Sequence, residues 1–144
     1  MNDAGHEGDT EVTFAMIKPD AVGAGHVDEV LTRIREEGFA VLQVRHATLT
    51  EDEVEALYQE HTARPFWPDL KAFMLSGSVV LLKLSRADAV AHWRHVLGAT
   101  DARKAEPGTL RHTFGNKDGV IFRNVAHGSD SAAAASRECA LWWA

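Results

Sequence analysis

The stretch from Arg123 to Ser131 carries the residues of this chain that are best suited to chemistry. It reads Arg-Asn-Val-Ala-His-Gly-Ser-Asp-Ser, so an apolar approach leads to His127, and small residues follow before an alanine-rich run. This order predicts a histidine at a strand-to-helix turn, beside the positive end of the helix dipole. An imidazole nitrogen there could attack phosphorus at neutral pH. Taken alone, a histidine in a turn is more often a surface or capping residue.

A second segment with chemical potential spans residues 63–70. It combines two prolines, Phe66, Trp67 and Arg64 within eight residues, which excludes a long helix or a central strand. The segment could pack as a lid on its own hydrophobic base. Alternatively, an aromatic ring beside an arginine could hold a flat, charged ligand such as a nucleotide.

Several cations and one carboxylate stand at positions from which they could reach a cleft. Lys18 ends an apolar strand, where it is either solvated or directed inward. Arg94 borders the apolar stripe of a helix, and Pro107 is well placed to start a helical turn that carries Arg111. Glu138 follows His127 by eleven residues, about two turns into the last helix, and could face back toward the turn.

Composition limits the classes of function. The 144 residues have a formal net charge of −6, so non-specific attraction to nucleic acid or to an anionic membrane is not expected. The single Cys139 excludes an internal disulfide and is interpreted as a packing residue. We predict a cytoplasmic protein, with a disordered tail over residues 1–10 and one domain over residues 11–144.

Hydrophobic periodicity and capping signals predict an alternation of strands and helices. Strands are expected over 12–17, 39–46 and 78–84, with a fourth leading into the His127 stretch; helices are expected over 24–37, after a capping box at Thr50-x-x-Glu53, after a similar signal at Ser85-x-x-Asp88, and after Asp130 or Ser131. This order suggests an α/β (α+β) sandwich: a four-stranded antiparallel sheet covered by helices. The ferredoxin-like split βαβ arrangement is one solution.

Taken together, these residues resemble the nucleoside diphosphate kinases. The resemblance covers essentially all of residues 11–143. It rests on five segments that occur in the same order: Thr13-Phe14-Ala15-Met16-Ile17-Lys18-Pro19-Asp20, Arg64-Pro65-Phe66-Trp67, Leu97-Gly98-Ala99-Thr100, Pro107-Gly108-Thr109-Leu110-Arg111 and Asn124-Val125-Ala126-His127-Gly128-Ser129-Asp130-Ser131. The histidine stretch is the most specific of these segments.

The resemblance implies a ferredoxin-like fold and a ping-pong exchange of the γ-phosphoryl group between nucleoside tri- and diphosphates. It makes His127 the nucleophile, which becomes phosphohistidine, and makes Glu138 the acceptor of a hydrogen bond from the other ring nitrogen. It places Lys18 and Tyr58 beside the transferred phosphoryl group, and Ser129 near His127 and Glu138.

The resemblance also implies a set of nucleotide-binding residues. Phosphates would be held by cations and a hydroxyl, the base would stack on an aromatic ring, and the ribose would be bound by Asn124 with Lys18. The implied set is Lys18, Arg64, Phe66, Leu70, Arg94, Thr100, Arg111 and Asn124. Stacking accepts any base face, so tolerance of many nucleosides is expected.

Mg²⁺ would arrive on the nucleotide phosphates without a full set of protein ligands, and Asp130 would act at most through water. The implied substrates are ATP, GTP, ADP, GDP and their deoxy forms, and a homo-oligomer is expected. One departure from the family is a three-residue excess between Phe114 and His127, through Gly115-Asn116-Lys117-Asp118-Gly119, where the family closes its base pocket. Another is Asp101-Ala102, where asparagine-proline is usual.

Two other functions are weighed against the kinase. The first is a nucleotide-binding or regulatory protein on the same fold that has lost turnover, but the complete catalytic set favours an active enzyme. The second is a metal-binding module built on the eight histidines. His92 and His95 stand at i, i+3 without a carboxylate or cysteine at a helpful offset, so a solvated helix face is the better interpretation.

Overall fold

The central element of the fold is β1, Thr10–Ile17, in a computed structural model that describes residues 10–143. Its residues 13–17 are fully buried on both faces of the sheet. β1 pairs antiparallel with β3 on one side and with β4 on the other, while β2 pairs antiparallel with β3, giving the order β2-β3-β1-β4. The C-terminal end of β1 therefore lies beside β4, the strand that contains His127.

The remaining elements alternate along the chain as the periodicity predicted. The other strands are β2 (Ala40–Ala47), β3 (Val79–Ala87) and β4 (Ala126–Gly128). The helices are α1 (Pro19–Gly23), α2 (Val27–Glu36), α3 (Glu51–Leu57), α4 (Trp67–Met74), α5 (Ala89–Leu97), α6 (Leu110–Phe114) and α7 (Ala132–Ala140), with 3₁₀ turns η2 (Gln59–His61) and η3 (Ala102–Lys104). None of the helices within residues 10–143 is both long and apolar enough to cross a membrane.

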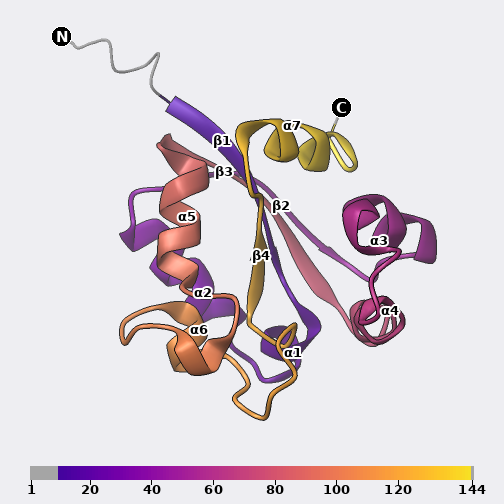
Figure 1. Cartoon of the computed structure of the whole chain (residues 1–144). Coiled ribbons are helices and arrows are strands. Elements are labelled where there is room, and N and C mark those ends of the chain that lie inside the picture. The colour runs from indigo at the N-terminus through magenta and orange to yellow at the C-terminus, as the bar shows by residue number, and fades with distance from the viewer. Residues whose placement is uncertain (1–9, 144) are drawn as a thin grey trace, which may run out of the picture.

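Helices cover both faces of the sheet (Figure 1). Because successive side chains of a strand point to opposite faces, Ala15 and Ile17 of β1 join a core with α2 and α5, which contributes the fully buried Trp93. Phe14 and Met16 join a second core with α3, α4 and α7. The structure confirms the predicted antiparallel, ferredoxin-like sandwich of four strands and covering helices.

The chain differs from the sequence-based expectations at several element ends. The expected tail over 1–10 lies outside the described residues except for Thr10. This residue begins β1 and pairs with Ala87 of β3. Ser85 does not open a helix, because β3 continues through it to Ala87 in register with β1. α5 instead begins after Asp88, which has a left-handed φ of 52°, and the Glu11 carboxylate accepts from the Val90 N–H at 2.8 Å.

One further helix starts later than predicted, and the structure identifies the caps of two others. Pro107 does not begin α6; Thr109 caps that helix, and the helix begins at Leu110. The capping box at Thr50 is confirmed by both of its hydrogen bonds. Ser131, not Asp130, caps α7, with its hydroxyl accepting from the Ala134 N–H at 3.0 Å.

The aromatic segment 63–70 is not a loop throughout, because α4 begins at Trp67 with Pro68 in its first turn. A proline is tolerated there since the first N–H groups of a helix have no intrahelical acceptor. The short α1, directly after Lys18, was not predicted; Pro19 likewise occupies its first position.

Gly128 is the position where β4 packs most closely against a helix. A Cβ added there would lie 2.7 Å from Trp93 Cδ1 and 3.2 Å from Leu97 Cδ1. We predict that Gly128→Ala lowers the free energy of unfolding by about 1–3 kcal/mol, because the buried indole cannot yield without strain. Urea denaturation measures this change. Gly23→Ala, where nothing lies within 4 Å, is the control and should not destabilise; equal effects at both positions would contradict the packing account.

Candidate active site

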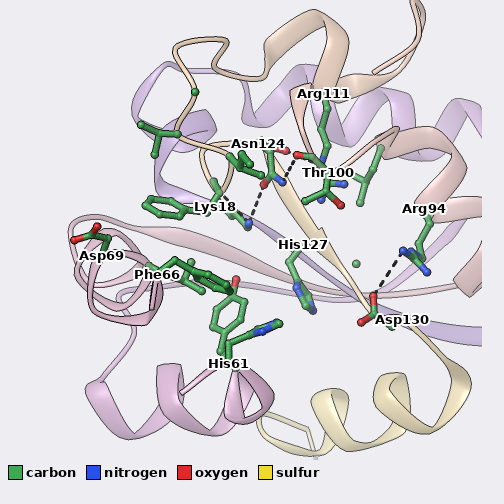
Figure 2. Close-up of a pocket in the computed structure, with 18 residues that line it drawn as sticks. Lys18, His61, Phe66, Asp69, Arg94, Thr100, Arg111, Asn124, His127 and Asp130 are labelled. Atoms are coloured by element: carbon green, nitrogen blue, oxygen red, sulfur yellow. Dashed lines mark hydrogen bonds and ion pairs between the residues drawn. The ribbon is translucent and has the colours of Figure 1, made fainter. Parts of the chain in front are cut away.

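A cavity of about 790 Å³ opens beside the β1–β4 pair and collects residues from most of the chain. This volume is within the range of small-molecule sites. Figure 2 shows His127 projecting into it, with Phe66 and His61 to one side and Lys18, Thr100, Arg111 and Arg94 around it. The predicted site residues that line the cavity are Lys18, Tyr58, Phe66, Leu70, Arg94, Thr100, Arg111, Asn124, His127 and Asp130.

His127 is fixed through both its backbone and its ring. It pairs with Met16 in the sheet, and its carbonyl accepts from Trp93 Nε1 at 3.1 Å. The imidazole is flanked by the rings of Tyr58 and Phe14, each with its centroid 5.7 Å away. The side chain is 17% exposed, so it is held in place while one edge still faces the cavity.

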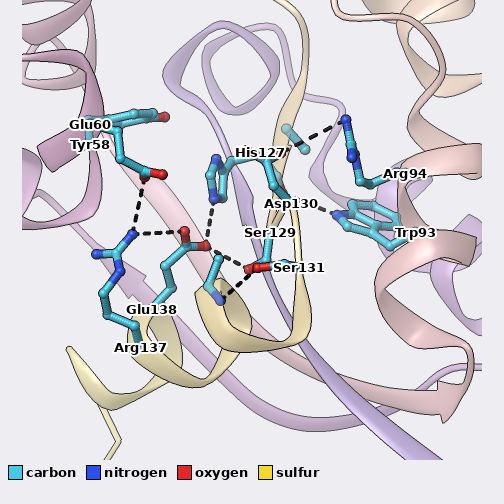
Figure 3. A network of polar contacts seen from close by, with 12 residues as sticks. Tyr58, Glu60, Trp93, Arg94, His127, Ser129, Asp130, Ser131, Arg137 and Glu138 are labelled. Atoms are coloured by element: carbon cyan, nitrogen blue, oxygen red, sulfur yellow. Dashed lines mark hydrogen bonds and ion pairs between the residues drawn. The ribbon is translucent and has the colours of Figure 1, made fainter.

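Glu138, in the last turn of α7, determines which ring nitrogen of His127 is free (Figure 3). Its Oε1 lies 2.9 Å from His127 Nε2 and also accepts from the Ser129 hydroxyl at 2.6 Å. A carboxylate oxygen can only accept, so Nε2 must carry the proton, and Nδ1 keeps its lone pair. Burial acts to raise the pKa of Glu138, but the His127 and Ser129 hydrogen bonds and the Arg137 charge hold it below its usual value. Glu138 therefore stays ionised.

The backbone that delivers His127 is strained. Val125 has φ of 81°, a left-handed value that a β-branched residue adopts only when its surroundings impose it. Here the Asp20 carboxylate accepts from the Val125 N–H at 3.0 Å, and the Val125 carbonyl accepts from the Lys18 N–H at 2.9 Å. The lysine-proline-aspartate motif after β1 thus holds the approach to the histidine.

Lys18 is a buried ammonium at the wall of the cavity. Its Nζ donates to the Asn124 side-chain oxygen at 2.8 Å and to the Phe122 carbonyl at 3.2 Å. Burial, with the nearby Arg111 charge, lowers the pKa of Lys18 to about 7, against an opposing effect of Asp20. An anion in the cavity would favour the charged form, because it supplies the counter-charge that burial removes.

Arg111 is buried with three of its donors committed to backbone carbonyls. Nε donates to Asn124 O at 3.0 Å, Nη1 to Gly98 O at 3.0 Å and Nη2 to Ala126 O at 2.7 Å. Burial and the Arg94 charge lower its pKa to about 10, which leaves it charged at neutral pH. The guanidinium therefore supports the segment before His127 and also presents charge to the cavity.

Arg94 and Tyr58 complete the polar wall in different ways. The Arg94 side chain is 54% exposed, with Nη2 3.9 Å from Asp130 Oδ1, so it is free to reorient toward a ligand. Tyr58 is buried, and within residues 10–143 its hydroxyl has one acceptor, the Met74 sulfur at 3.8 Å. Burial raises the pKa of Tyr58, which keeps the phenol protonated and able to donate.

The other end of the cavity is apolar. Phe66 is 42% exposed, and it lines the cavity together with Leu70 of α4 and residues 119–122. The Phe122 ring packs on Phe73 of α4 with centroids 5.3 Å apart. The segment that begins at Gly115, which is three residues longer than expected, therefore leads directly into residues that line the cavity.

Three predicted residues do not line the cavity. Ser129 and Glu138 lie behind His127: Glu138 Oε1 contacts His127 Nε2 and also accepts from the Ser129 hydroxyl. Arg64 is exposed between η2 and α4 and is not among the lining residues. Conversely, sequence reasoning missed His61 and Asp69, which do line it. His61 follows Tyr58 by three residues, and this spacing of one turn could have indicated that both side chains reach the same cavity.

The described residues offer no ready-made metal centre. Within residues 10–143, no group of three histidine, cysteine, aspartate or glutamate side chains is arranged to hold a metal ion. Asp130 is exposed at the edge of the cavity, beside Arg94. His92 contacts a single carboxylate, that of Glu37, at 2.7 Å.

Comparison with known proteins points to a single family. The family model described as "Nucleoside diphosphate kinase" matches residues 11–144. Nucleoside diphosphate kinases of Syntrophotalea carbinolica and Deinococcus radiodurans are each 42% identical to the chain, over 93% and 92% of its length and 96% and 94% of their own.

Solved structures agree with this match. The nucleoside diphosphate kinase of Aquifex aeolicus is 33% identical, with a TM-score of 0.87 over 94% of this chain and 96% of that one. That of Halobacterium salinarum, solved in complex with CDP, is 36% identical, with a TM-score of 0.88 over 92% and 87%. The chain belongs to the nucleoside diphosphate kinase family.

Proposed function

We propose that His127 Nδ1 is the atom that carries the phosphoryl group between nucleotides in this kinase. The observation that supports this is the bond from Nε2 to Glu138, which leaves the Nδ1 lone pair free at the cavity. In the first half-reaction Nδ1 attacks the γ-phosphorus, the bond to the bridging oxygen breaks, and the nucleoside diphosphate leaves with that electron pair. A second diphosphate then attacks phosphohistidine, and the imidazole leaves with its lone pair restored.

The cations of the cavity would stabilise charge on the transferred group. Lys18 and Arg111 are rigidly held by carbonyl and amide acceptors, so they need no reorganisation when charge develops on phosphate oxygens. The Tyr58 hydroxyl can donate to the same group. Arg94 and Thr100 are placed to bind the remaining phosphates, and His61, whose Nδ1 has no partner among the described residues, can donate or accept beside them.

The apolar end of the cavity suits a nucleoside. Phe66 exposes a ring face on which any base can stack, and Leu70 adds an apolar contact. Asn124 and Lys18 form one hydrogen-bonded pair that can bind ribose hydroxyls. The CDP complex of the Halobacterium salinarum relative supports a nucleotide in this cavity. We therefore infer broad use of ATP, GTP, ADP, GDP and their deoxy forms. A phosphate contact from Arg64 stays a prediction.

Mg²⁺ is proposed to enter on the nucleotide phosphates. The described residues do not form a ligand set that could hold the ion without the nucleotide. Asp130 is exposed at the cavity edge and could bind one of its waters. The ion then belongs to the substrate complex.

A homo-oligomer is proposed from the edge strand β2. Among the described strands β2 pairs with β3 alone, and it exposes Leu42 (48%) and Val44 (45%). Such an edge can pair with another strand, and a second copy of the chain supplies the same edge. A cytoplasmic location stays a prediction. The catalytically reduced binding protein is not favoured, since the relatives matched over almost their whole length are kinases.

The first prediction from the proposed function concerns the nucleophile. Incubation with ATP and Mg²⁺ should give a protein one phosphate heavier, acid-labile and base-stable, and added GDP should discharge it. His127→Ala should abolish the label without lowering the unfolding midpoint, whereas His95→Ala, an exposed histidine of α5, should keep it. Intact-mass spectrometry checks both. Label that persists in His127→Ala would show that the nucleophile is another residue.

The second prediction separates the two arginines. Arg111→Met should reduce kcat/KM by a factor of roughly 100, about 3 kcal/mol of transition-state stabilisation. It should also lower the free energy of unfolding by ~3 kcal/mol, since three carbonyls lose donors. Arg94→Met should raise KM with a stability change within about 0.5 kcal/mol. Steady-state kinetics and denaturation test this pair; an unchanged rate in Arg111→Met would remove it from the site.

The third prediction follows from the pKa of Lys18, about 7 in the free protein. A bound diphosphate should raise that pKa, so above pH 7 binding must take up a proton, and affinity should fall as pH rises. Below pH 7 this group should contribute no pH dependence. Calorimetric titration of ADP at pH 8, in two buffers of different ionisation enthalpy, measures the uptake. Lys18→Gln should lose it and Lys104→Gln should keep it; identical heats in both buffers for the unaltered protein would contradict the assignment.

A further inference from the structure

Glu138 has two carboxylate oxygens, and only one of them contacts His127. Oε1 receives both the imidazole and the Ser129 hydroxyl, at 2.9 and 2.6 Å. Among the residues that the structure describes, Oε2 has one donor, Nη2 of Arg137, at 3.4 Å (Figure 3). The side chain is 5% exposed, so water has little access to replace that donor. The orientation of the carboxylate therefore depends on its second oxygen as well as on its first.

Arg137 is itself held from the opposite side. Its Nη1 donates to the Ala56 carbonyl at 3.0 Å, and Nη2 lies 3.5 Å from Glu60 Oε1. Ala56 lies in the last turn of α3, whose carbonyls attract a cation. Glu60 is 67% exposed, so its ion pair contributes little. The hydrogen bond to the Ala56 carbonyl therefore anchors the guanidinium, and this bond would break if the guanidinium moved away from Glu138.

The same contact ties two parts of the site together. Residues 56–61 carry Tyr58 and His61 into the cavity, whereas α7 carries Glu138. Arg137 is a donor to both segments, yet it does not line the cavity. It can therefore affect the reacting histidine only through other residues.

We propose that Arg137 is a positioning residue for phosphoryl transfer: by fixing Glu138 Oε2 against the end of α3, it holds Oε1 on His127 Nε2 and so keeps Nδ1 unprotonated toward the nucleotide. The proposal rests on the function of His127 proposed above. Without the guanidinium, Glu138 could rotate about its terminal bond, and the histidine would populate both tautomers. Only the tautomer with a free Nδ1 can attack phosphorus.

The test compares Arg137→Ala with Arg137→Lys. In Arg137→Ala, kcat should fall about tenfold, the size expected for a small misplacement of a reacting group. KM for the nucleoside diphosphate should change less than about twofold, because Arg137 touches no part of the cavity. A lysine retains one charged donor for Oε2, so Arg137→Lys should recover part of the rate. Arg35→Ala, an exposed arginine of α2, is the charge-matched control and should behave as the unaltered protein.

A spectroscopic readout separates positioning from a merely structural role. Nitrogen-15 NMR of labelled histidine should show His127 protonated at Nε2 in the unaltered protein and in Arg35→Ala. The Nε2-protonated fraction should fall in Arg137→Ala and recover in Arg137→Lys. Glu138→Gln removes the carboxylate itself, so the tautomer fraction in this variant gives the largest change expected. A tautomer unchanged in Arg137→Ala, or a rate loss in both Arg137 variants that only follows the unfolding midpoint, would overturn the proposal.

The same experiment distinguishes failure of the inference from failure of the proposed function. If the unaltered protein takes no phosphate from ATP, His127 is not the carrier, whatever the tautomer measurements show. If it is phosphorylated on His127 and Arg137→Ala is phosphorylated at the same rate, the function stands and the role of Arg137 is wrong.

Discussion

The hydrogen bond between His127 and Glu138 is the interaction on which the site depends. Neutral imidazole exists as two tautomers, and a histidine that acts as a nucleophile must be held in the one whose reacting nitrogen is unprotonated. The buried Glu138 carboxylate fixes the tautomer, because it can accept a hydrogen bond from Nε2 but cannot donate one. The sheet places the histidine and α7 places the glutamate, so the bond exists only when β4 and α7 are both docked on β1.

The second constraint is the charge of the cavity. The whole chain is acidic, with a net charge of −6, yet Lys18 and Arg111 are buried side by side near the histidine. Their lowered pKa values are the physical sign of that arrangement. Carbonyl oxygens and Asn124 partly compensate them in the free protein. A polyphosphate completes the compensation, which is why a site of this kind favours a highly charged anion over a neutral sugar or peptide.

Much of the fold could be predicted from patterns along the chain. The buried run of β1, the capping box at Thr50 and the strand–helix alternation follow local rules, and the structure bears them out. One failure occurred where pairing with a neighbouring strand overruled a local signal. Ser85 resembles a helix cap, but pairing with β1 keeps it in β3, and Glu11 from β1 supplies the missing acceptor for α5.

The sequence alone determined which residue types are available: one histidine before a glycine, a glutamate eleven residues later, and basic side chains spread over about ninety residues. Only the tertiary structure decided that Lys18, Arg94, Arg111 and His127 line one cavity, that His61 joins them and that Arg64 does not. It also decided that Arg137, beside Glu138 in the chain, reaches Ala56 on another helix. Spacing in the sequence predicts contacts only between residues that are close in the chain, within one helical turn or between adjacent strands. Contacts between distant segments depend on how the helices pack against the sheet, and that packing is fixed by burial of the two cores rather than by any single motif.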